Sequence, residues 1–135
     1  MQRQVDVWWL FEHMVESEIN TVATAIRGAE FEGFVAGTLF SQGWNVSYRA
    51  LDIASLLHYI DNANEKISLL LISTDVEGFD RQTLEVVRSR GIKLFLFASS
   101  PAESEIYPES IPQPHTPLEL LGLIRGSLRV PMIRA

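Results

Sequence analysis

The fold of this 135-residue chain is decided by one stretch, Lys66-Ile67-Ser68-Leu69-Leu70-Leu71-Ile72-Ser73-Thr74-Asp75-Val76-Glu77-Gly78. The stretch is a continuous apolar run that stops abruptly in small, polar and acidic residues. An apolar run without polar alternation is typical of a strand buried on both faces, as in the centre of a parallel sheet. Because the carboxyl ends of such strands form the crevice where α/β proteins bind ligands, residues 73–75 are the first candidates for function.

Strand-like and helix-like segments alternate on both sides of this run. We expect further strands at residues 20–26, 44–49 and 92–98 with a short fifth near 110–112, and helices at residues 31–42, 53–62, 80–89 and 117–131. Asp52 is placed to cap the second helix, Gly91 follows the third, and Pro131 is expected to end the last. The alternation predicts an α/β fold of the flavodoxin-like class, a three-layer sandwich around a parallel sheet of about five strands.

One connection departs from this regular order. Between Ser100 and Ile111 the chain carries two prolines and three glutamates. This composition leaves little room for the helix that should follow the fourth strand, so a degenerate fourth helix is expected there.

Residues 1–18 precede the first strand and have helical spacing of apolar residues, which predicts an additional amphipathic N-terminal helix. A short strand over residues 5–11 is the alternative. Trp8, Trp9 and Phe11 give this segment a large apolar surface, which we interpret as a candidate interaction surface unless the segment packs on its own domain. The expected organisation is therefore an N-terminal segment (1–18), one α/β domain (19–131) and a short tail (132–135).

Composition argues against several classes of function. The net charge of −6 disfavours nucleic acid and anionic membranes as partners, and the lack of cysteine removes disulfides, thiolate metal sites and cysteine nucleophiles. No apolar run is long enough to span a bilayer, and acidic residues interrupt the N-terminus where a signal peptide would be apolar, so a cytoplasmic location is expected. His13, His58 and His115 lack the spacing of metal ligands, and no metal or other cofactor is expected.

The order of strands and helices resembles the receiver domain of bacterial response regulators. That resemblance implies an acidic pair after the first strand, a phosphate-accepting aspartate ending the third, a hydroxyl after the fourth, and a lysine before proline after the fifth. These groups are the ones phosphoryl transfer requires, namely a nucleophilic carboxylate, metal ligands, and a cation with a hydroxyl to hold the oxygens.

This chain departs from the receiver pattern at most of those positions. The acidic pair is replaced by Arg27 and its neighbours, the aspartate position holds Ser73 with Asp75 two residues beyond, and the lysine position holds Gln113. Only the hydroxyl position is kept, as Ser99. We call Arg27, Ser73, Asp75, Ser99 and Gln113 the degenerate receiver pocket. The pattern predicts a domain that is not an enzyme; the alternatives are a divergent receiver phosphorylated on Asp75 and a small-ligand sensor that uses this crevice.

Three longer runs, residues 24–32, 49–57 and 71–81, resemble the N-terminal domain of actinobacterial CpaE/TadZ-type pilus-assembly and septum-site-determining ATPases. In that family a degenerate receiver-like domain precedes a MinD/ParA-type ATPase. The resemblance implies an interaction or localisation module that works through a protein partner or a homodimer. The chain contains no Gly-x-x-x-x-Gly-Lys-[Ser/Thr] motif, so these residues do not themselves form the phosphate-binding loop of the ATPase.

Overall fold

The computed structural model describes residues 21–63 and 67–133, with side chains described up to residue 126. Five parallel strands form one sheet in the order β2-β1-β3-β4-β5. The strands are β1 (Val22–Ala25), β2 (Val46–Ala50), β3 (Leu69–Ser73), β4 (Lys93–Ala98) and β5 (Ile111–Pro112). The predicted flavodoxin-like α/β fold with a five-stranded parallel sheet is confirmed.

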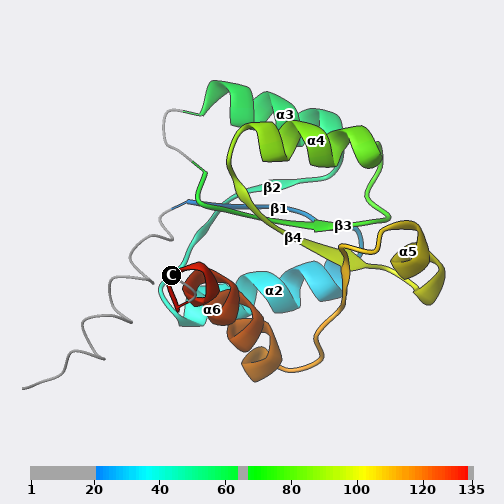
Figure 1. Cartoon of the computed structure of the whole chain (residues 1–135). Coiled ribbons are helices and arrows are strands. Elements are labelled where there is room, and N and C mark those ends of the chain that lie inside the picture. The colour runs from blue at the N-terminus through cyan, green and yellow to red at the C-terminus, as the bar shows by residue number, and fades with distance from the viewer. Residues whose placement is uncertain (1–20, 64–66, 134–135) are drawn as a thin grey trace, which may run out of the picture.

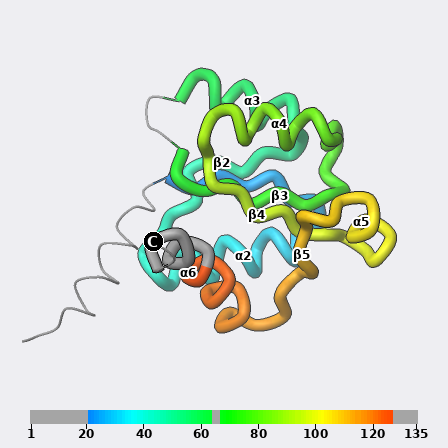
Figure 2. The backbone as a smooth tube through the Cα atoms, viewed as in Figure 1, coloured from blue at the N-terminus to red at the C-terminus, as the bar shows by residue number. Residues whose placement is uncertain are grey.

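Helices cover both faces of the sheet (Figure 1). One face carries α2 (Ala29–Ser41) and α6 (Pro117–Ile133), and the other carries α3 (Ile53–Asn62) and α4 (Arg81–Ser89). The remaining helix, α5 (Pro101–Ile106), lies near the end of β4, and the chain passes from it through β5 to α6 along one side of the sheet (Figure 2). Asp52 caps α3 as predicted, because its carboxylate accepts the backbone N–H of Ser55 at 2.7 Å.

The central strand β3 is buried on both faces, as its apolar run predicts. Every residue of β3 is 0 % exposed. Leu69 and Leu71 belong to the core under α2 and α6, whereas Leu70 and Ile72 belong to the core under α3 and α4. The alternation of side chains along a strand therefore splits one apolar run between two hydrophobic cores.

At the C-terminal end the structure confirms one detail of the sequence prediction and corrects another. The fourth helix is degenerate as expected: α5 has six residues, Ser100 accepts the N–H of Glu103 at 3.3 Å, and Pro101 occupies the first turn, where proline is tolerated. The last helix does not end at Pro131 but continues to Ile133. A proline inside a helix removes one backbone hydrogen bond, and only two residues of α6 follow Pro131.

The predicted N-terminal segment, residues 1–18, lies outside the described residues, and so do Trp8, Trp9 and Phe11. The predicted division into an N-terminal segment, a domain and a tail therefore stays a prediction. Among the helices of the part that the structure describes, none is long and apolar enough to cross a membrane.

Candidate functional site

Ser73 ends the central strand and connects it to the end of β1. Its side chain is completely buried, and its Oγ accepts a hydrogen bond from the backbone N–H of Arg27 at 2.9 Å. β1 and β3 are neighbours in the sheet, so their carboxyl ends meet as the topology predicts. The position that holds the phosphate-accepting aspartate in the receiver pattern is thus occupied by a buried, hydrogen-bonded serine.

Thr74 makes the equivalent connection between the ends of β3 and β4. Its backbone N–H donates to the carbonyl oxygen of Phe97 at 2.9 Å. The backbone N–H of Ser99 donates to Thr74 Oγ1 at 3.0 Å, and Thr74 Oγ1 in turn donates to Ser99 Oγ at 3.2 Å. The Ser99 hydroxyl, the one element that matches the receiver pattern, is therefore engaged by Thr74. The sequence prediction left Thr74 out of the pocket, although a hydroxyl residue directly after Ser73 was a visible signal.

Arg27 places a cation where a receiver needs carboxylates. The residue is exposed, and its backbone N–H rather than its guanidinium makes the hydrogen bond to Ser73. A magnesium ion needs oxygen ligands of negative charge, and an arginine beside it would oppose the binding of the ion. Within residues 21–63 and 67–133, no group of three or more histidine, aspartate and glutamate side chains is placed to hold a metal.

Asp75 lies in the loop after β3 and is half-buried. Its Oδ1 is buried and has no hydrogen-bond partner among the described residues. A buried carboxylate oxygen without a partner is costly, so the contacts of Asp75 do not explain its position, and the same holds for Thr24 Oγ1 in β1.

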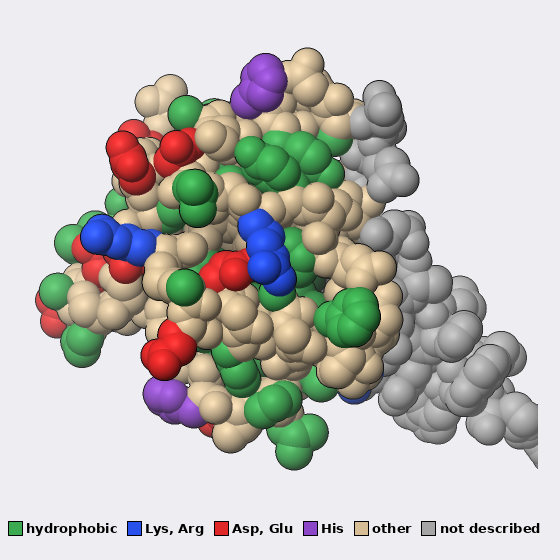
Figure 3. Space-filling model, turned by 180° about the vertical axis from the view of Figure 1, so that it is seen from behind, with side chains coloured by type: hydrophobic (Ala, Val, Ile, Leu, Met, Phe, Trp, Pro, Cys, Tyr) green, Lys and Arg blue, Asp and Glu red, His purple; other side chains and the backbone are tan. Residues whose placement is uncertain are grey.

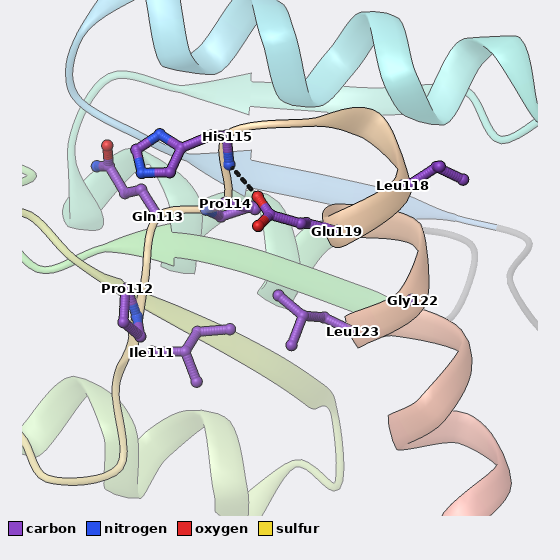
Figure 4. A pocket seen from close by; sticks show the side chains of 9 residues that line it. All are labelled: Ile111, Pro112, Gln113, Pro114, His115, Leu118, Glu119, Gly122 and Leu123. Atoms are coloured by element: carbon purple, nitrogen blue, oxygen red, sulfur yellow. Dashed lines mark hydrogen bonds between the residues drawn. The ribbon is translucent and has the colours of Figure 1, made fainter.

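Gln113 lies apart from this group. It follows β5 and lines a cavity of about 530 Å³ together with Ile111, Pro112, Pro114, His115, Leu118, Glu119, Gly122 and Leu123. The side chains of Ile111 and Leu123 point toward one another there, and Leu118 points away from the strand (Figure 4). None of the other four pocket residues lines this cavity. The structure thus brings Arg27 and Ser73 into contact, ties Ser99 to Thr74, and places Gln113 beside α6.

The polar groups at the rim of this cavity form the cap of α6. Glu119 Oε1 accepts the backbone N–H groups of His115 at 2.6 Å and Thr116 at 3.2 Å, and Thr116 Oγ1 accepts the N–H of Glu119 at 3.2 Å. This reciprocal arrangement is a capping box. The two backbone hydrogen bonds, from His115 first and then Thr116, lower the pKa of the Glu119 carboxyl. His115 and Glu119 therefore have a structural explanation that requires no chemistry.

A second polar cluster attaches the connection between α5 and β5 to α4. Arg81 donates to the Glu109 carboxylate and, at 2.9 Å, to the carbonyl oxygen of Ile106, while its guanidinium carbon lies 5.0 Å from the centre of the Tyr107 ring. Arg88 lies 3.5 Å from the same carboxylate. The short helix α5 is thus stabilised by contacts of its C-terminal end and the following loop with Arg81 and Arg88 of α4.

We expect Glu109→Gln to weaken the fold only where Glu109 is ionised. A hydrogen bond from its own backbone N–H, assisted by Arg81 and Arg88, lowers the pKa of the Glu109 carboxyl in the folded protein. A lowered pKa contributes stability above the unfolded value and loses it as the pH falls through the folded value. The free energy of unfolding of the variant should therefore be lower than that of the wild type by less than about 1 kcal/mol at pH 7, and the two should be equal near pH 3. Urea unfolding at both pH values measures this, with Glu105→Gln as the exposed control; an equal loss at both pH values would contradict it.

Solved structures share this fold. A CheY-like response regulator receiver domain protein from Methanospirillum hungatei JF-1 is 17% identical with a TM-score of 0.64, and the match covers 87% of this chain and 99% of that chain. SdrG from Pseudomonas melonis Fr1, in its BeF3-activated conformation, is 11% identical with a TM-score of 0.65, and the match covers 82% of this chain and 97% of SdrG. A yeast Spc42 coiled-coil segment fused to another protein is 17% identical with a TM-score of 0.67, and the match covers 85% of this chain and 80% of the fusion chain. No protein-family model and no curated protein matches the chain.

At these identities the likeness shows the fold alone. The chain has the CheY-like receiver fold, and the expected resemblance to receivers is confirmed at that level. Within that fold, Ser73 stands at the end of the central strand, where the receiver pattern expects an aspartate.

Proposed function

We propose that this chain is a non-catalytic, receiver-like protein-interaction domain. The observation that carries the proposal is the closed phosphoacceptor position, where Ser73 is 0 % exposed and its Oγ accepts the Arg27 N–H at 2.9 Å. Phosphoryl transfer to a receiver needs a carboxylate that can reach both the phosphate donor and a metal ion. A buried serine that is already hydrogen-bonded offers neither a carboxylate nor a metal ligand.

The groups around Ser73 support the same proposal. Arg27 supplies positive charge where metal ligands would be required, and the hydroxyls of Thr74 and Ser99 bond to one another at 3.2 Å. Thr74 donates its proton in this hydrogen bond, so its hydroxyl gains little by turning toward a phosphoryl oxygen, whereas Ser99 Oγ is the acceptor. The electrostatics of the strand ends therefore favour a domain without phosphoryl chemistry.

Exposed apolar side chains support a role in protein contacts. The large hydrophobic side chains that are exposed in the described part of the chain are Phe40, Leu51, Ile106, Leu118 and Leu123. The family-like runs at residues 24–32, 49–57 and 71–81 favour the CpaE/TadZ group. We therefore propose a cytoplasmic localisation domain that positions a MinD/ParA-type ATPase through a protein partner or a second copy, and that binds no nucleic acid.

Thermal unfolding with magnesium and beryllofluoride tests the loss of phosphoryl chemistry. A ligand present at 100 times its Kd stabilises a protein by about 2.7 kcal/mol, which raises the melting temperature by several degrees in a domain of this size. We expect no rise for this chain under conditions that stabilise a working receiver as the control. A rise of several degrees that requires both magnesium and beryllofluoride would overturn the proposal.

Phosphorylation of Asp75 is the alternative, and its partnerless Oδ1 is the observation that favours it. Incubation with labelled acetyl phosphate should leave the wild type unlabelled under our proposal. Labelling that is lost in Asp75→Asn but kept in Asp80→Asn would replace the proposal by a divergent receiver. The small-ligand alternative is tested in the same melting assay, where stabilisation by any member of a panel of nucleotides and anions would favour a sensor.

A further inference from the structure

Within the described part of the chain, the edge strand β2 has an open side. β2 pairs with β1 alone among the described strands, and with five residues it is much longer than β5 at the opposite edge, which has two. A sheet edge of this length presents unpaired N–H and C=O groups, which readily accept another strand. The other edge is short, as protected edges usually are.

Two exposed hydrophobic side chains flank β2, one at each end. Phe40 is 70% exposed and lies at the start of the strand, since it lines one cavity together with Asn45 and Val46. Leu51 is 86% exposed and directly follows the last residue of β2. Side chains of this size gain free energy when another surface removes them from water.

A hollow lies between α2 and β2 along the same edge. The cavity has a volume of about 380 Å³ and is lined by Gly33, Ala36, Gly37, Phe40, Asn45, Val46 and Arg49. The two glycines are one turn apart on α2, and nothing lies within 4 Å of where their Cβ atoms would be. The exposed Phe40 side chain therefore lies next to a hollow that has room for a hydrophobic side chain of another molecule.

The charge at the centre of this edge is neutralised. Arg49 projects from β2, and its Nε lies 2.9 Å from Glu32 Oε2, close enough for an ion pair although not aligned for a hydrogen bond. A free charge on an edge strand discourages pairing, and this pairing with Glu32 weakens that protection. In the view from behind, basic side chains lie next to acidic ones, and hydrophobic side chains form separate patches (Figure 3).

We propose that the β2 edge binds a second copy of this chain, with the two β2 strands antiparallel across a two-fold axis. An antiparallel pair places the end of each strand beside the start of the other, so Leu51 of one copy meets the hollow beside Phe40 of the other. A two-fold contact requires a self-complementary surface, and this edge carries both halves of the match. The two sheets then form one continuous ten-stranded sheet. This proposal gives the interaction domain a named surface and partner, and its test does not depend on the magnesium experiment.

Light scattering on the full chain tests the proposal. We expect twice the monomer mass of 15.2 kDa for the wild type and the monomer mass for the double variant Phe40→Glu/Leu51→Glu. Leu118→Glu is the matched control, because Leu118 is 82% exposed and lies on α6, and it should remain dimeric. Phe40 and Leu51 are both exposed, so their substitution should not disturb the core. Melting curves show whether each variant is folded. Leu51→Glu alone, outside any helix, serves if the double variant unfolds.

Spin labels test the geometry of the dimer. The chain has no cysteine, so Ser47→Cys and Glu105→Cys each give a single labelling position. Labels on neighbouring β2 strands lie across one strand spacing of about 4.8 Å and should broaden one another's spectra. Labels at position 105, on α5, lie near opposite ends of a sheet about 43 Å wide and should not.

Several results would overturn the proposal. A monomeric wild type at high micromolar concentration would do so, as would dissociation by Leu118→Glu. A third such result is a double variant Trp8→Ser/Trp9→Ser that is monomeric while Phe40→Glu/Leu51→Glu is still dimeric. It would assign assembly to the N-terminal segment instead. Unbroadened spectra from labels at position 47 in a confirmed dimer would place the contact on another face.

Discussion

Ser73→Asp should destabilise the fold by about 3 kcal/mol or more at pH 7, although aspartate is the residue that the receiver pattern carries there. Ser73 is 0 % exposed, and the one described donor to its side chain is the backbone N–H of Arg27. The neighbouring hydroxyls of Thr74 and Ser99 donate to or accept from one another. A carboxylate at this position would be buried without the metal ion and lysine that compensate its charge in a working receiver.

The pH dependence separates charge from size in this prediction. Burial raises the pKa of the introduced carboxyl above its unfolded value of about 3.9, because Arg27 contacts position 73 through its backbone N–H and its side chain is screened by solvent. An acid whose pKa is raised in the folded state destabilises the protein when it is ionised, so the loss should shrink as the pH falls toward 4. Ser73→Asn is the matched control, because it has nearly the same size without the charge, and its loss should not depend on pH.

Magnesium provides the decisive comparison for Ser73→Asp. Urea unfolding of the variant at pH 7, with and without millimolar magnesium, should give the same midpoint. If magnesium restores the stability of the variant, the strand ends still form a metal site once the carboxylate is present, and the argument that Arg27 opposes a metal ion there is wrong. Ser73→Ala then measures the hydrogen bond alone, and should cost about 1 kcal/mol because it removes the partner of the Arg27 N–H.

The sheet could be predicted from the sequence because its signals are local and mutually consistent. The apolar run before Ser73 predicted a doubly buried strand, and Asp52 predicted the start of α3. The ends of neighbouring parallel strands meet by topology, so the contact between Arg27 and Ser73 also followed from the strand order.

The remainder of the candidate site depends on side-chain geometry that a sequence does not contain. Thr74 and Ser99 each directly follow a strand, but the sequence does not show that their hydroxyls turn toward one another. Gln113 occupies the expected position after β5, but β5 has only two residues, and the chain turns there into the capping box of α6. The exposed Phe40 was also missed, because it directly follows the buried Leu39 in an apolar helix and only packing shows which of the two faces the solvent.

Leu70→Ala and Leu71→Ala are expected to cost nearly the same, about 3 kcal/mol each. Both side chains are 0 % exposed, but they point to opposite faces of β3, into the core under α3 and α4 and the core under α2 and α6 respectively. Each substitution removes buried methylene and methyl groups and leaves a cavity that the packed helices fill only in part. A sheet covered on one face alone would give one large and one small loss.

The free energies of unfolding in urea measure this pair, and the slope with urea concentration shows whether both variants still unfold in one step. Leu118→Ala is the control for the chemistry of the substitution, since Leu118 is 82% exposed and its loss should stay within about 0.5 kcal/mol. If the two variants lose unequal amounts of unfolding free energy, and the smaller decrease is close to that of Leu118→Ala, one layer of helices is loosely attached. Equal losses would mean that β3 holds both layers, and with them the ends of β1 and β4 that close the position of Ser73.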